Sequence, residues 1–199
     1  MRRDTKFALP VKAIKVPTGP DWLHEIKHDG YRLMLVREQE RVRLFSKSGL
    51  DWTKRFPWIV ESALKIRQQQ FTLDGEAVLL GVDGKSDFAG LHSGKHNAEV
   101  QFYAFDMLAG DGDDYRRLPL SMRKTNLARL LARRADGIHA ASFEQGEIGP
   151  ELFRHACLMG LEGLVSKHRE RAYGVGRCTH WLKVKNPKHP AYRRVQDQF

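Results

Sequence analysis

Residues 22–36 read WLHEIKHDGYRLMLV, two apolar strand-like runs interrupted by Lys27 and by an Asp-Gly pair. Asp-Gly between apolar runs is a strong signal for a tight turn, so residues 22–27 and 31–36 are predicted to form a hairpin. Lys27 would then stand at the rigid end of a strand. An exposed lysine beside an ordinary hairpin has the same local sequence, so this segment alone does not assign a reaction.

Short strand-like runs rich in Val, Leu, Phe and Tyr continue along the chain between Gly-containing turns. They cover residues 22–27, 31–36, 41–45, 71–80, 100–108, 164–168 and 181–185. Helical spacing of apolar residues occurs at 51–69, 121–134 and 149–160, with Asp51 or Thr53 expected to cap the first helix and Ser121 to open the second. Because strands outnumber helices and rarely alternate with them, we predict one α+β domain, residues 1–199, with mostly antiparallel sheets.

The composition indicates a globular protein that binds a polyanion. The chain has 199 residues, 41% of them apolar, and no apolar run long enough to cross a membrane, so we expect a cytoplasmic protein, a monomer with no membrane partner. Cys157 and Cys178 lack metal-type spacing and are expected to be free thiols. The net charge is +10, and residues 177–194 contain several Lys and Arg but no acid. Such a field attracts nucleic acid, although a merely solubilising surface is the alternative.

Several strand-like runs carry polar residues where packing alone does not require them. Alternation places Glu25 and Lys27 on one face of their strand, and Asp74 and Glu76 on one face of residues 71–80. In the last run two lysines, at 183 and 185, also share a face. Like charges side by side repel, so an anion bound between these lysines would turn a cost into binding.

Five short motifs in a fixed order carry a resemblance to a known family. They are KHDGYR at 27–32, LDGE at 73–76, YAFD at 103–106, EGLVSK at 162–167 and WLKVK at 181–185. This set resembles the covalent nucleotidyltransferases, most closely the ATP-dependent DNA ligases. The sequence around the motifs is similar to that of the ligase domain of bacterial end-joining ligases. The resemblance spans residues 22–188. It implies the ATP-grasp-like adenylation fold of DNA ligases and mRNA capping enzymes, with a nucleotide cleft between sheets.

The resemblance also implies a reaction. Lys27 would attack the α-phosphorus of ATP, form a lysyl-adenylate and release pyrophosphate. AMP would pass to the 5′-phosphate of nicked or broken double-stranded DNA, where the 3′-hydroxyl displaces it, as in DNA repair and recombination. Lys185 would be the second catalytic residue, and Glu162 and Glu76 would hold Mg²⁺ or Mn²⁺. The implied nucleotide contacts are Glu25 with the adenine edge, Ile26 beside the nucleophile, Arg32 and Glu76 with the ribose, Phe105 and Val165 on the two faces of the base, and Lys47, Arg177, Lys183 and Lys185 with the nucleotide or its phosphates.

Lysine chemistry agrees with this assignment. The ordinary pKa of lysine is about 10.4, so the neutral amine that attacks phosphorus is scarce at pH 7. Neighbouring cations lower the pKa of an ammonium group, and Lys185, Lys183, Arg32 and a bound metal are the candidates. The same charges would neutralise the phosphate oxygens as pyrophosphate leaves.

Two features depart from the family pattern. The FSKSG segment has Lys47 where the family usually has arginine, which replaces a bidentate contact by a point charge. The family also continues into an oligonucleotide-binding (OB) barrel of about a hundred residues, whereas only 14 residues follow Lys185 here. We therefore expect no OB-fold within residues 1–199, and a separate OB-fold or end-joining protein as a partner.

Two other functions stay open at this level. The chain could use RNA ends, or GTP in a capping-type reaction, with the same covalent chemistry. It could also be a non-catalytic nucleic-acid-binding remnant that needs an OB-fold partner. Labelling with ATP or GTP separates these alternatives. The bacterial type of the resemblance further implies association with the nucleoid.

Overall fold

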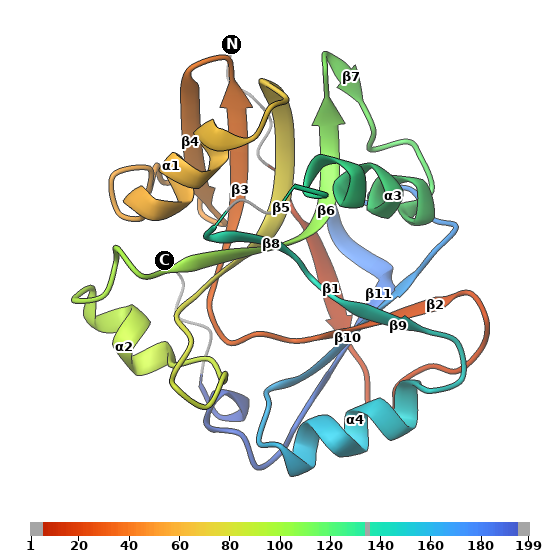
Figure 1. Cartoon of the computed structure of the whole chain (residues 1–199). Coiled ribbons are helices and arrows are strands. Elements are labelled where there is room, and N and C mark those ends of the chain that lie inside the picture. The colour runs from red at the N-terminus through yellow and green to blue at the C-terminus, as the bar shows by residue number, and fades with distance from the viewer. Residues whose placement is uncertain (1–5, 134–135, 195–199) are drawn as a thin grey trace.

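The computed structural model describes residues 6–133 and 136–194, whose strands form two sheets (Figure 1). Sheet A has the order β1-β11-β10-β2-β9 and sheet B the order β4-β3-β5-β6-β7, with β8 beside β6. The strands of sheet A are β1 (Ala8–Lys12), β2 (Trp22–Ile26), β9 (Phe143–Gln145), β10 (Gly163–His168) and β11 (Gly176–Lys185). Those of sheet B are β3 (Tyr31–Glu38), β4 (Arg41–Ser46), β5 (Gln70–Val78), β6 (Gln101–Gly110), β7 (Asp113–Asp114) and β8 (Ile138–Ala140).

Most strand pairs are antiparallel, which confirms the predicted fold class. Only β1 with β11 and β6 with β8 pair in parallel among the described residues. All seven predicted strand runs are present, with boundaries that differ by one to five residues. The largest difference is at β11, which begins at Gly176 because its first half pairs with β1, a strand that the sequence pattern did not predict.

The predicted hairpin at residues 22–36 is wrong. Strand β2 pairs with β10 and β9 in sheet A, whereas β3 pairs with β4 and β5 in sheet B. The Asp-Gly segment therefore carries the chain from one sheet to the other. Lys27 still belongs to sheet A, because its N–H donates to the Gly163 carbonyl at 2.9 Å. Long-range pairing overrides the local turn preference here.

Within the described part of the chain, five helical segments flank the sheets. They are α1 (Pro57–Lys65), α2 (Phe88–Ser93), α3 (Leu120–Leu130), α4 (Gly149–Leu158) and the 3₁₀ turn η1 (Pro190–Tyr192). Figure 1 shows α1 and α3 beside the strands of sheet B and α4 along sheet A, and α3 packs on β6 while α4 packs on β10. The long helix-like pattern at 51–69 yields only the nine residues of α1.

The predicted helix starts are wrong for α1 and α3. Asp51 accepts hydrogen bonds from Thr53, which closes a local turn before the helix instead of capping it. Helix α1 begins at Pro57, whose fixed φ suits a first helical position. Helix α3 begins at Leu120, because the Ser121 N–H donates to the Arg169 carbonyl and is already inside the first turn.

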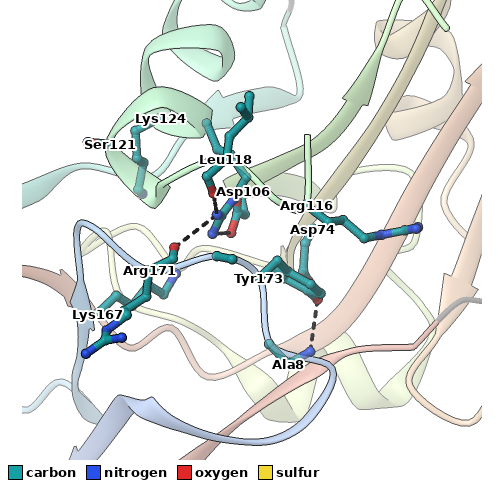
Figure 2. Close-up of polar contacts among 12 residues, drawn as sticks. Ala8, Asp74, Asp106, Arg116, Leu118, Ser121, Lys124, Lys167, Arg171 and Tyr173 are labelled. Atoms are coloured by element: carbon teal, nitrogen blue, oxygen red, sulfur yellow. Dashed lines mark hydrogen bonds and ion pairs between the residues drawn. The ribbon is translucent and has the colours of Figure 1, made fainter. Parts of the chain in front are cut away.

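The largest core lies between sheet B and helices α1 and α3, and smaller cores lie between the sheets and under α4. Buried charges join these layers. Arg123 donates to both Asp106 oxygens, and Tyr173 donates to Asp74. Tyr173 also accepts from the Ala8 N–H (Figure 2). The Arg123 contact ties α3 to β6, whereas Tyr173 links Ala8 of sheet A to Asp74 of sheet B.

Cys157 and Cys178 are both free, as expected. Within residues 6–133 and 136–194, no helix has the length and apolar character needed to cross a membrane.

Candidate active site

A cavity of about 550 Å³ lies between the two sheets. Every residue that the sequence assigned to the nucleotide or metal lines it, except Arg177. These are Glu25, Ile26, Lys27, Arg32, Lys47, Glu76, Phe105, Glu162, Val165, Lys183 and Lys185. Sheet A supplies one wall and sheet B the other, because β2, β10 and β11 contribute from one side and β3, β5 and β6 from the other. A cleft between sheets is the arrangement that the resemblance implied.

Glu162 joins the two lysines at the centre of the cavity. Its Oε2 lies 2.6 Å from Lys27 Nζ and its Oε1 lies 3.2 Å from Lys185 Nζ. The Glu162 side chain is 3% exposed and Lys27 is 20% exposed, so the carboxylate is buried while the nucleophile candidate reaches the cavity. Lys185 also donates to the Ala191 carbonyl at 3.3 Å. One carboxylate thus orients two ammonium groups from different strands of sheet A.

Lys183, the other lysine on this face of β11, completes a positive cluster with Lys27 and Lys185. Burial lowers the pKa of Lys183, and the ammonium groups of Lys27, Lys185 and Lys47 lower it further. The predicted like-charge cost on β11 is therefore present. A polyphosphate bound among these lysines would remove that repulsion and gain charge-assisted hydrogen bonds.

Glu76 faces this cluster from β5. Burial raises its pKa to about 7, partly offset by the charges of Lys27 and Arg32 and reinforced by the Glu162 and Asp74 carboxylates. Glu76 and Glu162 fit the way proteins bind Mg²⁺, in which one or two carboxylates act with substrate phosphates. Among the described residues no group of three or more His, Cys, Asp and Glu side chains could hold a metal, so the phosphates would supply the remaining ligands.

Arg32 makes more hydrogen bonds within the protein than the sequence suggested. Its guanidinium donates to Asp74 at 3.0 and 2.7 Å and to the Ala8 carbonyl at 2.6 Å. Burial opposes its charge, but Asp74 outweighs that effect and raises the pKa of Arg32. Arg32 still lines the cavity, so its predicted contact with a ribose stays a prediction.

Glu25 lies in β2, two residues before Lys27, between two lysines. Lys167 Nζ is 2.6 Å from Glu25 Oε2, and Lys124 Nζ is 2.5 Å from Oε1. Lys167 also lies over the Phe105 ring, 3.9 Å from its centroid. Because Phe105 comes from sheet B and Val165 from sheet A, these two residues lie on opposite walls of the cavity.

Arg177 does not line the cavity. It is exposed near the start of β11, opposite Leu9 of β1, six residues before Lys183. The pairing with β1 shifts between Cys178 and Leu182, so Lys183 lies opposite Lys12, only three residues of β1, or roughly 10 Å, from Leu9. The role of Arg177 in nucleotide binding stays a prediction.

Sequence reasoning missed several cavity residues. Trp52, Phe88, Tyr103, Trp181 and Arg194 line the cavity, as does Lys167, which lies within the fourth motif but had no predicted role. Arg194 donates to both Asp29 oxygens at 2.9 and 2.8 Å and lies 4.1 Å from the Phe88 ring centroid. Lys124 was predicted only as part of a helix, although helical spacing places Arg123 and Lys124 on the same face as the apolar Leu127, which was a usable signal.

Comparison with known proteins identifies the family of the chain. The family model described as the ATP dependent DNA ligase domain matches residues 6–185. The multifunctional non-homologous end joining protein LigD of Pseudomonas aeruginosa is 33% identical over 175 residues, 86% of this chain and 21% of that protein. A probable DNA ligase of Streptomyces coelicolor is 34% identical over 181 residues, 83% of this chain and 35% of that protein. The chain thus spans about a fifth to a third of these curated relatives.

Two solved structures show the same arrangement. The ligase domain of Mycobacterium tuberculosis LigD superposes with a TM-score of 0.81 at 29% identity, covering 93% of this chain and 62% of that one. A mycobacterial DNA ligase D complexed with ATP and MES superposes with a TM-score of 0.80 over the same shares. The matched residues include all five motifs and both walls of the cavity. The chain belongs to the family of ATP-dependent DNA ligase domains.

Proposed function

We propose that the described residues form one adenylation domain in which Lys27 takes AMP from ATP. The observation that carries this proposal is the cluster of Lys27, Glu162, Lys183 and Lys185 in a cavity between two sheets. The Lys27 nitrogen forms a bond to the α-phosphorus, and the bond from that phosphorus to the bridging oxygen of pyrophosphate breaks. Glu162, 2.6 Å from Lys27 Nζ, is placed to accept the proton that the ammonium group gives up.

The other cavity residues have supporting roles in this proposal. Lys183 and Lys185 bind the phosphates and offset the charge that develops on the leaving pyrophosphate. Phe105 and Val165 enclose the base from the two walls. A divalent cation, Mg²⁺ or Mn²⁺, held by Glu76 and Glu162 together with phosphate oxygens, would neutralise phosphate charge.

The acceptor in this proposal is the 5′-phosphate of nicked or broken double-stranded DNA, where the 3′-hydroxyl then displaces AMP. The net charge of +10 suits a polyanion, and relatives of the chain are named for end joining and DNA repair. A separate OB-fold or end-joining protein would supply the rest of the DNA-binding surface. DNA as the substrate would place the protein in the cytoplasm, at the nucleoid.

The test is covalent labelling. The protein is incubated with ATP labelled at the α-phosphate and Mg²⁺, and the label that survives a denaturing gel is measured. Lys27→Ala should abolish labelling, whereas Lys95→Ala, which removes an exposed lysine, should not. Chelation of the divalent cation should also stop the reaction.

The same assay decides between the alternatives. Label from GTP but not from ATP would favour a capping-type reaction. A protein that takes label from neither nucleotide, even at raised pH, would be a nucleic-acid-binding remnant. Sealing of a nicked duplex that carries a pre-adenylated 5′ end, compared with the same duplex built with an RNA strand, would test the final step and its preference for DNA.

A further inference from the structure

Glu25 is held by two cations although one would neutralise it. The Glu25, Lys167 and Lys124 side chains are 4%, 2% and 5% exposed, and each carboxylate oxygen has an ammonium group within 2.6 Å. Lys167 comes from the neighbouring strand β10, whereas Lys124 comes from α3, outside both sheets (Figure 2). Burying a second cation lowers the stability of the fold, because charge is poorly solvated inside a protein. Its presence therefore points to a function.

The surroundings leave this charge incompletely balanced. Lys167 also faces Asp106, but that carboxylate is already bound by both arms of the Arg123 guanidinium. Two carboxylates and three cations leave one excess positive charge. The faces of aromatic rings take up part of it, since Lys124 lies 5.0 Å from the Phe143 centroid and Lys167 lies over Phe105 and Trp181.

The Lys124 and Glu25 side chains are close, but their hydrogen-bond geometry is not ideal. Neither Lys124 Nζ nor Glu25 Oε1 makes an aligned hydrogen bond to any described residue, although both atoms are buried. A carboxylate oxygen can accept more than one hydrogen bond, so Oε1 can receive a donor from a ligand in addition to its contact with the Lys124 ammonium group, 2.5 Å away. Glu25 and Lys167 line the cavity, whereas Lys124 does not. Lys124 therefore acts on the cavity through these two lining residues, and its direct contact is with Glu25.

We propose that Lys124 is a positioning residue that holds the Glu25 carboxylate in place to accept a hydrogen bond from the amino group of the purine. This inference rests on the proposed use of ATP and adds a residue that sets the affinity for the base. Burial alone would raise the pKa of Glu25, but Lys124 and Lys167 together lower it, so the carboxylate stays ionised. An ionised carboxylate only accepts hydrogen bonds, which suits an amino group and repels a carbonyl oxygen.

Lys124 has a second, measurable effect on Lys167. Burial lowers the pKa of Lys167 to about 8, Glu25 and Asp106 raise it, and Lys124 lowers it. The Lys167 ammonium holds Glu25, so ATP affinity should fall as the pH rises through about 8 in the unmodified protein. Removal of the Lys124 charge should raise the Lys167 pKa and move this loss to higher pH.

The experiment measures the dissociation constant of ATP without divalent cation, so that no adenylate forms, from pH 6.5 to 9.5. Lys124→Met removes the charge and keeps the stem, and Lys124→Gln keeps a donor in case the first variant fails to fold. Lys124→Arg tests rescue, and Arg129→Met removes an exposed cation from the same helix as a control. Inorganic tripolyphosphate, which has no base, is titrated in parallel.

The expected result is a loss of ATP affinity of about 10- to 100-fold in Lys124→Met and a smaller loss in Lys124→Gln, because a charge-assisted contact is worth that much. Tripolyphosphate affinity and the adenylation rate at saturating ATP should stay within about threefold of the unmodified protein. The alkaline loss of affinity should move upward in both variants, and Lys124→Arg should restore most of the binding.

Equal losses for ATP and tripolyphosphate would overturn the inference, because they would assign Lys124 a general electrostatic or structural role. Unchanged ATP binding, or an alkaline limb that does not move, would overturn it as well. If the unmodified protein takes label on Lys27 while the Lys124 variants bind ATP normally, only this inference fails. If the unmodified protein neither binds ATP nor takes label, the proposed function fails first.

Discussion

Glu162 lies 2.6 Å from the Lys27 ammonium group, although the two residues are 135 positions apart in the chain. This contact couples the end of β2 to the start of β10 and orients the nucleophile candidate. Gly163 supports it from the backbone, because its carbonyl accepts from the Lys27 N–H.

The first prediction concerns this carboxylate. Glu162→Gln should slow adenylation by about 100-fold or more, because it removes both a proton acceptor and a charge partner of Lys27 and Lys185. The measurement is the single-turnover labelling rate with α-labelled ATP. Glu170→Gln changes a half-exposed glutamate just after β10 and should leave that rate unchanged. Equal rates in the two variants would remove Glu162 from the mechanism.

The second prediction concerns the buried pair Arg123–Asp106, in which both side chains are 0% exposed. Arg123→Met should lower the free energy of unfolding by about 3–5 kcal/mol, because it leaves a buried carboxylate without its partner. Arg116→Met breaks a surface pair with Asp114 and should cost less than about 1 kcal/mol. Urea denaturation of the two variants gives the comparison, and similar losses would contradict the assignment.

The third prediction concerns Gly163, which has a φ of +142°. An added Cβ would lie 2.1 Å from the Val184 carbonyl oxygen, so Gly163→Ala should push β10 away from β11 and displace Glu162. Both adenylation, measured as the labelling rate, and stability, measured by urea denaturation, should fall, the latter by about 2 kcal/mol or more.

Gly160→Ala is the matched control, because Gly160 also has a positive φ but has open space where a Cβ would be added. Its cost should be limited to the left-handed conformation, about 1 kcal/mol. A Gly163→Ala variant as stable and active as this control would show that β10 tolerates the side chain.

The fourth prediction concerns pH. Burial raises the folded-state pKa of Glu76 to about 7 from an ordinary 4.5, so the folded protein binds more protons than the unfolded chain between these values. The Glu76 contribution therefore favours the fold at low pH and is lost as the pH rises to about 7. Glu76→Gln should exceed the unmodified protein in stability by less than about 1 kcal/mol at pH 5 and by about 3 kcal/mol at pH 8.

Urea denaturation between pH 5 and pH 8, without divalent cation, checks this sign. If the stabilities of Glu76→Gln and the unmodified protein change in parallel with pH, Glu76 does not titrate in this range. The opposite order, in which the unmodified protein gains stability as the pH rises, would mean that Lys27 and Arg32 outweigh the burial of Glu76.

The sequence predicted the features that depend on residues close together in the chain, such as strand positions and the faces of side chains. The alternation of apolar side chains located the strands, and the same alternation put Lys183 and Lys185 on one face. The order of the motifs identified the family and, with it, eleven residues that line the cavity. The predicted cap of α1 failed because Asp51 makes its own turn with Thr53, a local competition that helical spacing does not register.

Partners distant in the chain came only from the tertiary structure. Residues 22–36 by themselves set two strands and a strand-end lysine, yet they could not reveal that β2 and β3 join different sheets, because any strand edge can pair with several others. They also could not reveal that Glu25 meets Lys167, 142 positions away, and Lys124 of α3. Burial decides these contacts: an ion pair forms where folding excludes water from both charges, and that exclusion is a property of the packed chain and not of any segment.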